Sequence, residues 1–314
     1  KGNINNWLSY RYRQRLNRSN DSSGNIDNLP TSIDIAGIGV KLGKGFSIFA
    51  GKQCTAYGGI EFDLNPIEIY EYSDMIENMS NFMTGLNIGY DINAHQQLNL
   101  QILDSRNGSF NKTYGVETED GEQPTIESGK LPLVYTLNWN GNFNDVFKTR
   151  WSASIMNEAK DKNLYYFAFG NELNLNKFNM FLDFMYSKEG IDRKGIMTGI
   201  TGSMEGHNAF DAGYFSMVTK LNYRFLPKWN AFVKGMYETA SLTKQQGDLE
   251  KGKYRTAWGY FAGVEFYPMD TNLHFFLTYV GRSYDFTARA KALGQENYST
   301  NRVSVGFIYQ LPMF

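Results

Sequence analysis

The sequence predicts an all-β fold, a closed antiparallel transmembrane β-barrel of about 14 strands (14–16), from three observations. Apolar and polar residues alternate with a period of two in many segments. In the final segment one face holds Val303, Val305, Phe307, Tyr309 and Leu311. No apolar run approaches the roughly 18 residues that a membrane helix needs. Short turns alternate with long loops, as in outer-membrane barrels, whose turns are periplasmic and whose loops are extracellular.

Each predicted strand has an apolar side and a polar side, as expected of a wall between lipid and water. The strands are predicted over residues 6–18, 33–42, 46–53, 82–92, 97–105, 131–140, 146–156, 164–174, 178–187, 214–225, 229–239, 257–267, 273–283 and 302–314. Most are near the roughly 9–11 residues with which a tilted strand crosses a bilayer. Residues 46–53 alternate least clearly, so either Lys52 faces lipid near an interface or a bulge at Gly51 redirects it.

The connections indicate a single barrel domain over residues 1–314. Short links are predicted at 43–45, 92–96, 140–145, 174–177, 226–229 and 269–272. Longer stretches lie at 19–32, 54–80, 106–130, 188–213, 243–255 and 285–299, and only 158–163 is brief among them. The chain begins at what resembles another short turn, so an upstream strand is a further expectation, and 14 or about 16 strands both fit the even numbers of such barrels.

The composition excludes several classes of protein. The net charge of −1 offers no basic field for nucleic acid. Cys54 is the only cysteine, so neither a disulfide framework nor a cysteine-based metal site is expected. Residues 1–5 lack the apolar stretch of a signal peptide, so an exported protein would be represented here by a processed chain or by one that lacks its beginning.

Basic residues recur on the polar side of the predicted strands. Arg11, Arg13 and Arg15 share one face, and on the lipid side each would cost roughly 2–4 kcal/mol near the bilayer midplane, so we expect them to face the lumen. There they either ease anion entry or pair with acidic residues and brace the wall. The residues expected to line the pore are Arg11, Arg13, Arg15, Lys41, Lys148, Arg150, Lys220, Arg224 and Lys234.

Residues 54–80 are expected to form an acidic loop that folds into the lumen and narrows it. The length of this stretch and its mixture of apolar and acidic side chains favour this interpretation over an exposed surface loop. Its carboxylates are Glu61, Asp63, Glu68, Glu71, Asp74 and Glu77. An acidic loop opposite a row of arginines gives a transverse field and little net selectivity, so phosphate is not predicted as the solute.

Two stretches resemble the phosphate-selective porin O and P family in the form common in Bacteroidetes. The first is residues 6–17, Asn-Trp-Leu-Ser-Tyr-Arg-Tyr-Arg-Gln-Arg-Leu-Asn, and the second comprises residues 50–53 and 57–63. The resemblance implies a water-filled outer-membrane pore, often trimeric, with basic residues along an anion path and a strand that leads into an inward-folding loop. The chain departs from the family in showing 14 strands where proteobacterial members have 16, and in Phe314, which is out of register with the final strand beyond Pro312.

Other candidate sites are weaker. Glu117, Glu119, Asp120 and Glu122 form an acidic cluster within residues 117–122 that could hold Ca²⁺, but the spacing is not that of an EF-hand, and a solvated loop tip is the simpler interpretation. The three histidines are scattered, so no metal site is predicted. A barrel enzyme would need His207 beside Ser203, Asp192 or Asp211 near one rim. The tryptophans fall near predicted strand ends, consistent with interfacial girdles.

These observations together predict a non-enzymatic porin in the outer membrane of a Gram-negative bacterium. We expect passive diffusion of small hydrophilic solutes, with a leaning toward anions, and no cofactor. The expected partners are outer-membrane lipids and either a homotrimer or another outer-membrane protein. The alternative is a structural or partner-binding barrel subunit of a larger outer-membrane complex, in which a loop such as 188–213 docks the partner.

Overall fold

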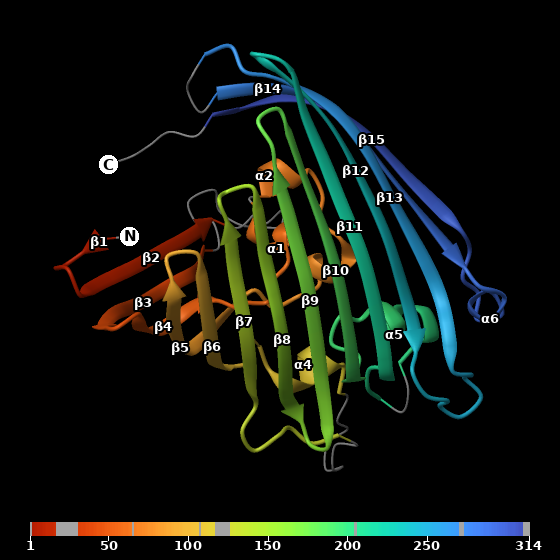
Figure 1. The fold of residues 1–314 in the computed structure, drawn as a ribbon. Coiled ribbons are helices and arrows are strands. Elements are labelled where there is room, and N and C mark those ends of the chain that lie inside the picture. Colours follow the sequence, from red (N-terminus) through yellow and green to blue (C-terminus); the bar gives the residue numbers. More distant parts are fainter. Residues whose placement is uncertain are drawn as a thin grey trace.

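The structure, a computed structural model, describes residues 2–16, 31–64, 66–106, 108–116, 126–203, 206–269 and 273–309. It is one 15-stranded antiparallel sheet in which every strand pairs with its neighbours in the chain (Figure 1). The strands are β1 (Gly2–Asn3), β2 (Leu8–Leu16), β3 (Thr31–Gly43), β4 (Phe46–Cys54), β5 (Phe82–Asn93), β6 (Gln96–Asp104), β7 (Leu133–Phe143), β8 (Phe147–Ala159), β9 (Lys162–Asn174), β10 (Phe178–Ile191), β11 (Phe210–Leu226), β12 (Trp229–Leu242), β13 (Gly252–Phe266), β14 (Leu273–Phe286) and β15 (Tyr298–Tyr309). The all-β prediction is confirmed, and the predicted strands correspond to β2–β15.

The sheet is open, which differs from the closed barrel that the alternation predicts. Strands β1 and β15 are its two edges, and the described residues show no pairing between them. The physical reason lies in β1, which has only 2 residues and pairs with β2 at Gly2–Tyr10 and Asn3–Ser9. So short an edge offers few backbone groups to match the 12 residues of β15.

The two faces of the sheet have the character that the alternation predicts. The convex face is apolar and exposed, as at Leu137 and Val233, which are 55% and 51% exposed. Lys52 stays in register opposite Ala36 and Thr84, with no shift in the ladder at Gly51. Lys52 therefore shares the convex face with the apolar residues of β4. Of the two alternatives for this strand, the structure agrees with a lipid-facing Lys52 and not with a bulge at Gly51.

The helices are short, and all lie in the longer connections. Between β4 and β5 are α1 (Ile60–Asp63), α2 (Pro66–Ile69) and α3 (Asp74–Glu77). The others are α4 (Phe110–Tyr114), α5 (Ile196–Thr201) and α6 (Ala288–Lys291), which follow β6, β10 and β14. In the described part of the chain, no helix is long and apolar enough to span a bilayer.

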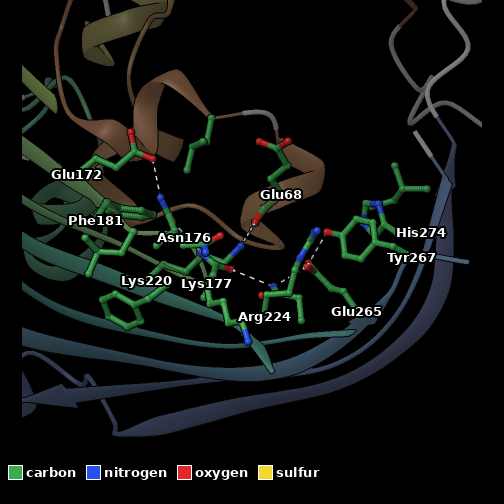
Figure 2. A pocket seen from close by; sticks show the side chains of 17 residues that line it. Glu68, Glu172, Asn176, Lys177, Phe181, Lys220, Arg224, Glu265, Tyr267 and His274 are labelled. Atoms are coloured by element: carbon green, nitrogen blue, oxygen red, sulfur yellow. Dashed lines mark hydrogen bonds between the residues drawn. The ribbon is translucent and has the colours of Figure 1, made fainter. Parts of the chain in front are cut away.

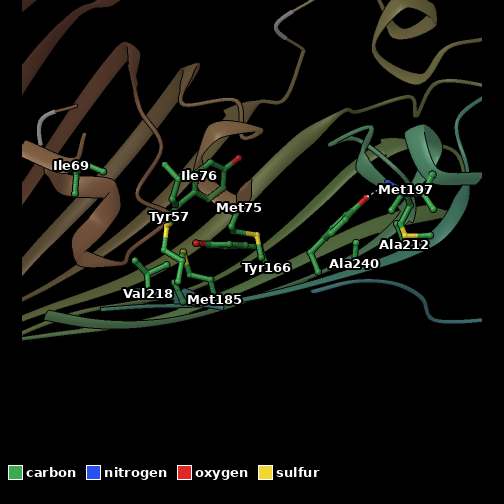
Figure 3. Close-up of a cluster of buried hydrophobic side chains, with 14 of the residues drawn as sticks. Tyr57, Ile69, Met75, Ile76, Tyr166, Met185, Met197, Ala212, Val218 and Ala240 are labelled. Carbon is green, nitrogen blue, oxygen red and sulfur yellow. Dashed lines mark hydrogen bonds between the residues drawn. The ribbon is translucent and has the colours of Figure 1, made fainter. Parts of the chain in front are cut away.

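The apolar core lies on the concave face of the sheet, where the chain between β4 and β5 packs against the central strands. We call residues 54–80 the inner segment. Figure 3 shows its Tyr57 and Met75 among buried side chains of the sheet such as Tyr166 and Met185. Gly170 of β9 permits this close approach, because a Cβ atom there would lie 2.7 Å from the Cα of Gly59.

Candidate functional site

Backbone hydrogen bonds attach the first part of the inner segment to the sheet. The buried carboxylate of Asp183, on β10, accepts from the backbone N–H groups of Ile60 at 2.9 Å and Glu61 at 2.7 Å. The Gly59 N–H donates to the carbonyl of Arg150 at 2.9 Å. The first turn of α1 is therefore held between β8 and β10, since its free N–H groups find acceptors on the strands.

A fully buried ion pair fixes the middle of the inner segment. The Lys234 ammonium, on β12, lies 2.7 Å from Glu61 Oε1, and both side chains are 0% exposed. Ser73 completes the shell, because its backbone N–H donates to Glu61 Oε1 at 3.1 Å and its hydroxyl donates to Glu61 Oε2 at 2.5 Å. Lys234 also donates to the carbonyl of Glu71 at 2.6 Å. Such satisfaction of every partner is what makes a buried charge pair tolerable.

Three arginines from β13–β15 neutralise the end of the inner segment. Arg282 contacts Glu238 at 2.7 Å, Asp74 at 2.9 Å and Glu71 at 3.3 Å. Arg255 also pairs with Asp74, and Arg302 lies 3.4 Å from Glu71. None of the three arginines was among the residues predicted to line the pore. Each lies on the side of its strand opposite the apolar residues, and this alternation indicates the polar face of the sheet.

The pocket in Figure 2 lies beneath α2, with a volume of about 480 Å³. Lys220 of β11 donates to the carbonyl of Glu68 at 2.7 Å, and the Tyr70 hydroxyl donates to Glu265 at 2.8 Å. Burial and the neighbouring Glu265 raise the pKa of the Tyr70 phenol, which keeps it a hydrogen-bond donor. Arg224 stacks on Tyr267 at 5.1 Å. Basic and acidic groups therefore balance each other around this pocket.

A second cavity, of about 530 Å³, lies between the inner segment and strands β2–β8. We call it the N-terminal cavity. Arg11, Arg150 and Lys41 line it, together with Asp63 from the inner segment and a set of amide side chains. Arg150 pairs with Asp63 at 2.9 Å, whereas Arg11 lies over the ring of Phe49 at 5.6 Å. Within the described residues, neither Arg11 nor Lys41 forms an ion pair.

The remaining predicted residues lie as follows. Arg13 shares the concave side with Arg11 and pairs with Asp34 at 3.4 Å. The side chain of Arg15 lies outside the described part. Lys148 is half-buried opposite Glu172, and Glu77 is exposed at the end of α3.

The structure bears differently on the candidate metal site and on the candidate enzyme site. The acidic cluster at residues 117–122, like Pro312 and Phe314, falls outside the described residues, which themselves hold no metal-ligating group of side chains. His207 is buried, and its Nδ1 lies 2.6 Å from the Asn208 carbonyl, while Asp211 pairs with Lys244. Among the described residues, no hydrogen bond joins His207 to Ser203, Asp192 or Asp211.

An antiparallel sheet with an apolar convex face and an acidic segment bound to its concave face defines the class of outer-membrane porins. The family model of phosphate-selective porin O and P matches residues 1–311, and the chain belongs to this family. The predicted family is confirmed. The protein is a porin channel of the Gram-negative outer membrane, as predicted.

Solved structures share the fold at low sequence identity. The outer membrane channel DcaP of Acinetobacter baumannii matches with a TM-score of 0.62 and 11% identity, over 96% of this chain and 79% of that one. The outer membrane protein OmpT of Vibrio cholerae matches in a form without loop L8, with a TM-score of 0.55 and 11% identity over 97% and 86% of the two chains. Its trimer form matches with a TM-score of 0.54 and 11% identity over 91% and 78%. No curated protein matches the sequence.

Proposed function

We propose that this porin passes small hydrophilic solutes by passive diffusion and prefers anions. The observation that carries the proposal is an asymmetry of charge on the concave face. Four carboxylates of the inner segment, those of Glu61, Asp63, Glu71 and Asp74, are paired with Lys234, Arg150 and the arginines of β13–β15, whereas Glu68 and Glu77 are exposed and outside the N-terminal cavity. Arg11 and Lys41, on the opposite wall of the N-terminal cavity, have no carboxylate partner in the described part of the chain. The lining of the N-terminal cavity, which holds Arg11, Lys41, Arg150 and Asp63 as its charged residues, is therefore net positive, and this favours anion entry.

The inner segment is the proposed constriction. It covers the concave face of β8–β14 through the contacts of Glu61, Asp74 and Tyr70, so solutes are left the space along β2–β8. In this proposal Arg11, Arg13 and Lys41 line the path, whereas Lys220 and Lys234 mainly hold the constriction in place. The alternative role of the predicted cations, which is to pair with acidic residues and brace the wall, is therefore assigned in this proposal to the lysines on the C-terminal strands.

We further propose that the sheet closes in the membrane and that the protein forms a homotrimer. An open edge such as β15 would leave backbone N–H and C=O groups unpaired in lipid, at a cost of several kcal/mol for each group. Val305 of β15 is 82% exposed, so its convex side is suited to lipid or to a neighbouring subunit. The trimer form of the structurally similar OmpT supports this choice. Cross-linking in native outer membranes tests it, and a monomer alone would contradict it.

Planar-bilayer recording in a KCl gradient tests the channel and its charge preference. A charge about 6 Å from the ion path contributes about 0.4–0.7 kcal/mol after partial screening, or about two- to threefold in permeability. The double variant Arg11→Gln/Lys41→Gln is therefore expected to lower the chloride-to-potassium permeability ratio about fourfold or more. The matched control Lys244→Gln, whose side chain is exposed and paired with Asp211, is expected to leave the ratio unchanged. A protein without single-channel conductance would refute the channel, and an unchanged ratio in the double variant would refute the charge role.

A further inference from the structure

The ring of Phe49 lies on bare backbone at the wall of the N-terminal cavity. Phe49 of β4 pairs with Gly39 of β3, and Gly37 lies two residues before Gly39 on the same face of the sheet. A Cβ atom at Gly37 would lie 2.7 Å from the Phe49 ring, and one at Gly39 would lie 3.5 Å from it. The ring therefore occupies the space that a side chain at Gly37 would need.

The same glycines let a cation reach that ring from the next strand. Arg11 of β2 is the register partner of Gly37, so β3 presents only glycines opposite Arg11 on one side and Phe49 on the other. The guanidinium carbon of Arg11 lies 5.6 Å from the centre of the Phe49 ring, within the roughly 6 Å at which an aromatic face attracts a cation. Both residues line the cavity, with Arg11 exposed and Phe49 half-buried.

This contact restrains a charge without cancelling it. Within the described residues no ion pair fixes the Arg11 guanidinium, whereas Arg150 of the same cavity is paired with Asp63 at 2.9 Å. A carboxylate partner brings a full negative charge, but an aromatic ring has no net charge and attracts the cation through its quadrupole. A solute in the cavity therefore meets the whole positive charge of Arg11, held in one place.

We propose that Phe49 is a positioning residue for anion selectivity, which holds the Arg11 guanidinium at the cavity wall and leaves its charge available to solutes. Without the ring, the long and flexible side chain of Arg11 would move through solvent, where its charge is screened more fully. This inference rests on the proposed channel function, because it assigns the residue that fixes one of the cations of the same path.

The side-chain Nε–H signal of Arg11, recorded by NMR on the intact protein in nanodiscs, tests the contact without requiring conduction. The signal is assigned by its loss in Arg11→Gln. A ring at an exposed site holds a cation about two- to fivefold more often than an aliphatic side chain does. Phe49→Leu is therefore expected to make the signal more mobile and to shift it toward that of free arginine. Replacing Phe49 by 3,4,5-trifluorophenylalanine, which keeps the shape of the ring but withdraws electrons from its face, should have the same effect.

Ion selectivity tests the role of the contact. Phe49→Leu is expected to lower the chloride-to-potassium permeability ratio about 1.5- to 2-fold, which is part of the about two- to threefold that one charge contributes beside the path. In the Arg11→Gln background the same substitution should leave the ratio unchanged, because Phe49 acts through Arg11. Phe49→Tyr, which keeps a ring, should keep the ratio.

The matched control is Phe167→Leu, on the convex face of β9 and outside the N-terminal cavity, which should change neither the signal nor the ratio. An Arg11 signal as rigid in Phe49→Leu as in the unaltered protein would overturn the inference. A fall in the permeability ratio that persists in the Arg11→Gln background would overturn it as well. An immobilised Arg11 in a protein without single-channel conductance would uphold the contact and refute the channel, so the two failures are distinct.

Discussion

At the scale of single residues, the Glu61–Lys234 pair determines how firmly the inner segment is held. Removing one partner leaves a buried charge without compensation, which typically costs about 3–5 kcal/mol. Glu61→Gln is therefore expected to lower the thermal unfolding midpoint in detergent markedly and to increase current noise, because the segment becomes mobile. Glu61→Leu/Lys234→Met, which removes both charges, should recover most of that loss. A single variant as stable as the unaltered protein would contradict the role of the pair.

Residue parity along the strands predicts which side chains share a face, but not which of them meet. Lys220, Lys234 and Arg150 were expected on the polar face because they alternate with apolar neighbours, and the register of the sheet places them there. Their partners could not be predicted, because Lys234 meets Glu61 across 173 residues of chain, Lys220 meets the Glu68 carbonyl across 152, and Arg150 meets Asp63 across 87. Long-range pairing depends on the path of a loop, which strand periodicity does not encode.

At the scale of elements, α5 shows how the loop after β10 is fixed. Asp192 accepts hydrogen bonds from the backbone of Gly195 at 3.0 Å and Thr198 at 2.8 Å and from the Tyr214 hydroxyl at 2.6 Å. Met197 of α5 is buried. Within the loop 188–213, which the alternative function expects to dock a partner, α5 therefore packs on the sheet of its own chain.

The Asp192 carboxyl should make this packing depend on pH. Burial, followed by the charge of Glu189, raises the pKa of Asp192 above its usual value of about 3.9. A folded state that binds the proton more tightly than the unfolded state loses stability as pH rises from the unfolded pKa through the folded pKa. Hydrogen exchange at residues 195–201, corrected for its intrinsic rate, is therefore expected to be slowest below pH ~4. Asp192→Asn should remove that dependence, and a variant with the same pH profile would contradict this assignment.

At the scale of the whole molecule, the charge asymmetry should make ion selectivity depend on salt. Arg11 and Lys41 act on the path through water, so their effect weakens as the Debye length falls from about 10 Å at 0.1 M to about 3 Å at 1 M. The chloride-to-potassium permeability ratio is therefore expected to fall toward unity with increasing KCl. Arg302 is paired with Glu71, so the variant Arg302→Gln should change the dependence of the permeability ratio on salt only a little. A ratio independent of salt would indicate selection by size rather than by charge.

The overall architecture was predictable to a large extent, because lipid and water impose the same alternation on every strand. The short link between β8 and β9, where Lys160 and Asp161 join the strands, was also expected. Closure of the sheet into a barrel could not be predicted from the sequence. It depends on whether the backbone groups of the first and last strands pair, and side-chain periodicity carries no information about that pairing. The six short helices in the described part of the chain were not predicted for a related reason, since each has only 4–6 residues and packs against other parts of the fold.

The position of the inner segment between β4 and β5 has a consequence for the order of assembly. Strands that pair with their chain neighbours can be added one after another, but Glu61 must wait for Lys234, which lies 173 residues further along. The segment can therefore dock only after most of the sheet exists. Until then its apolar side chains remain uncovered beside the growing sheet, so covering of the concave face is a late event in the maturation of this protein.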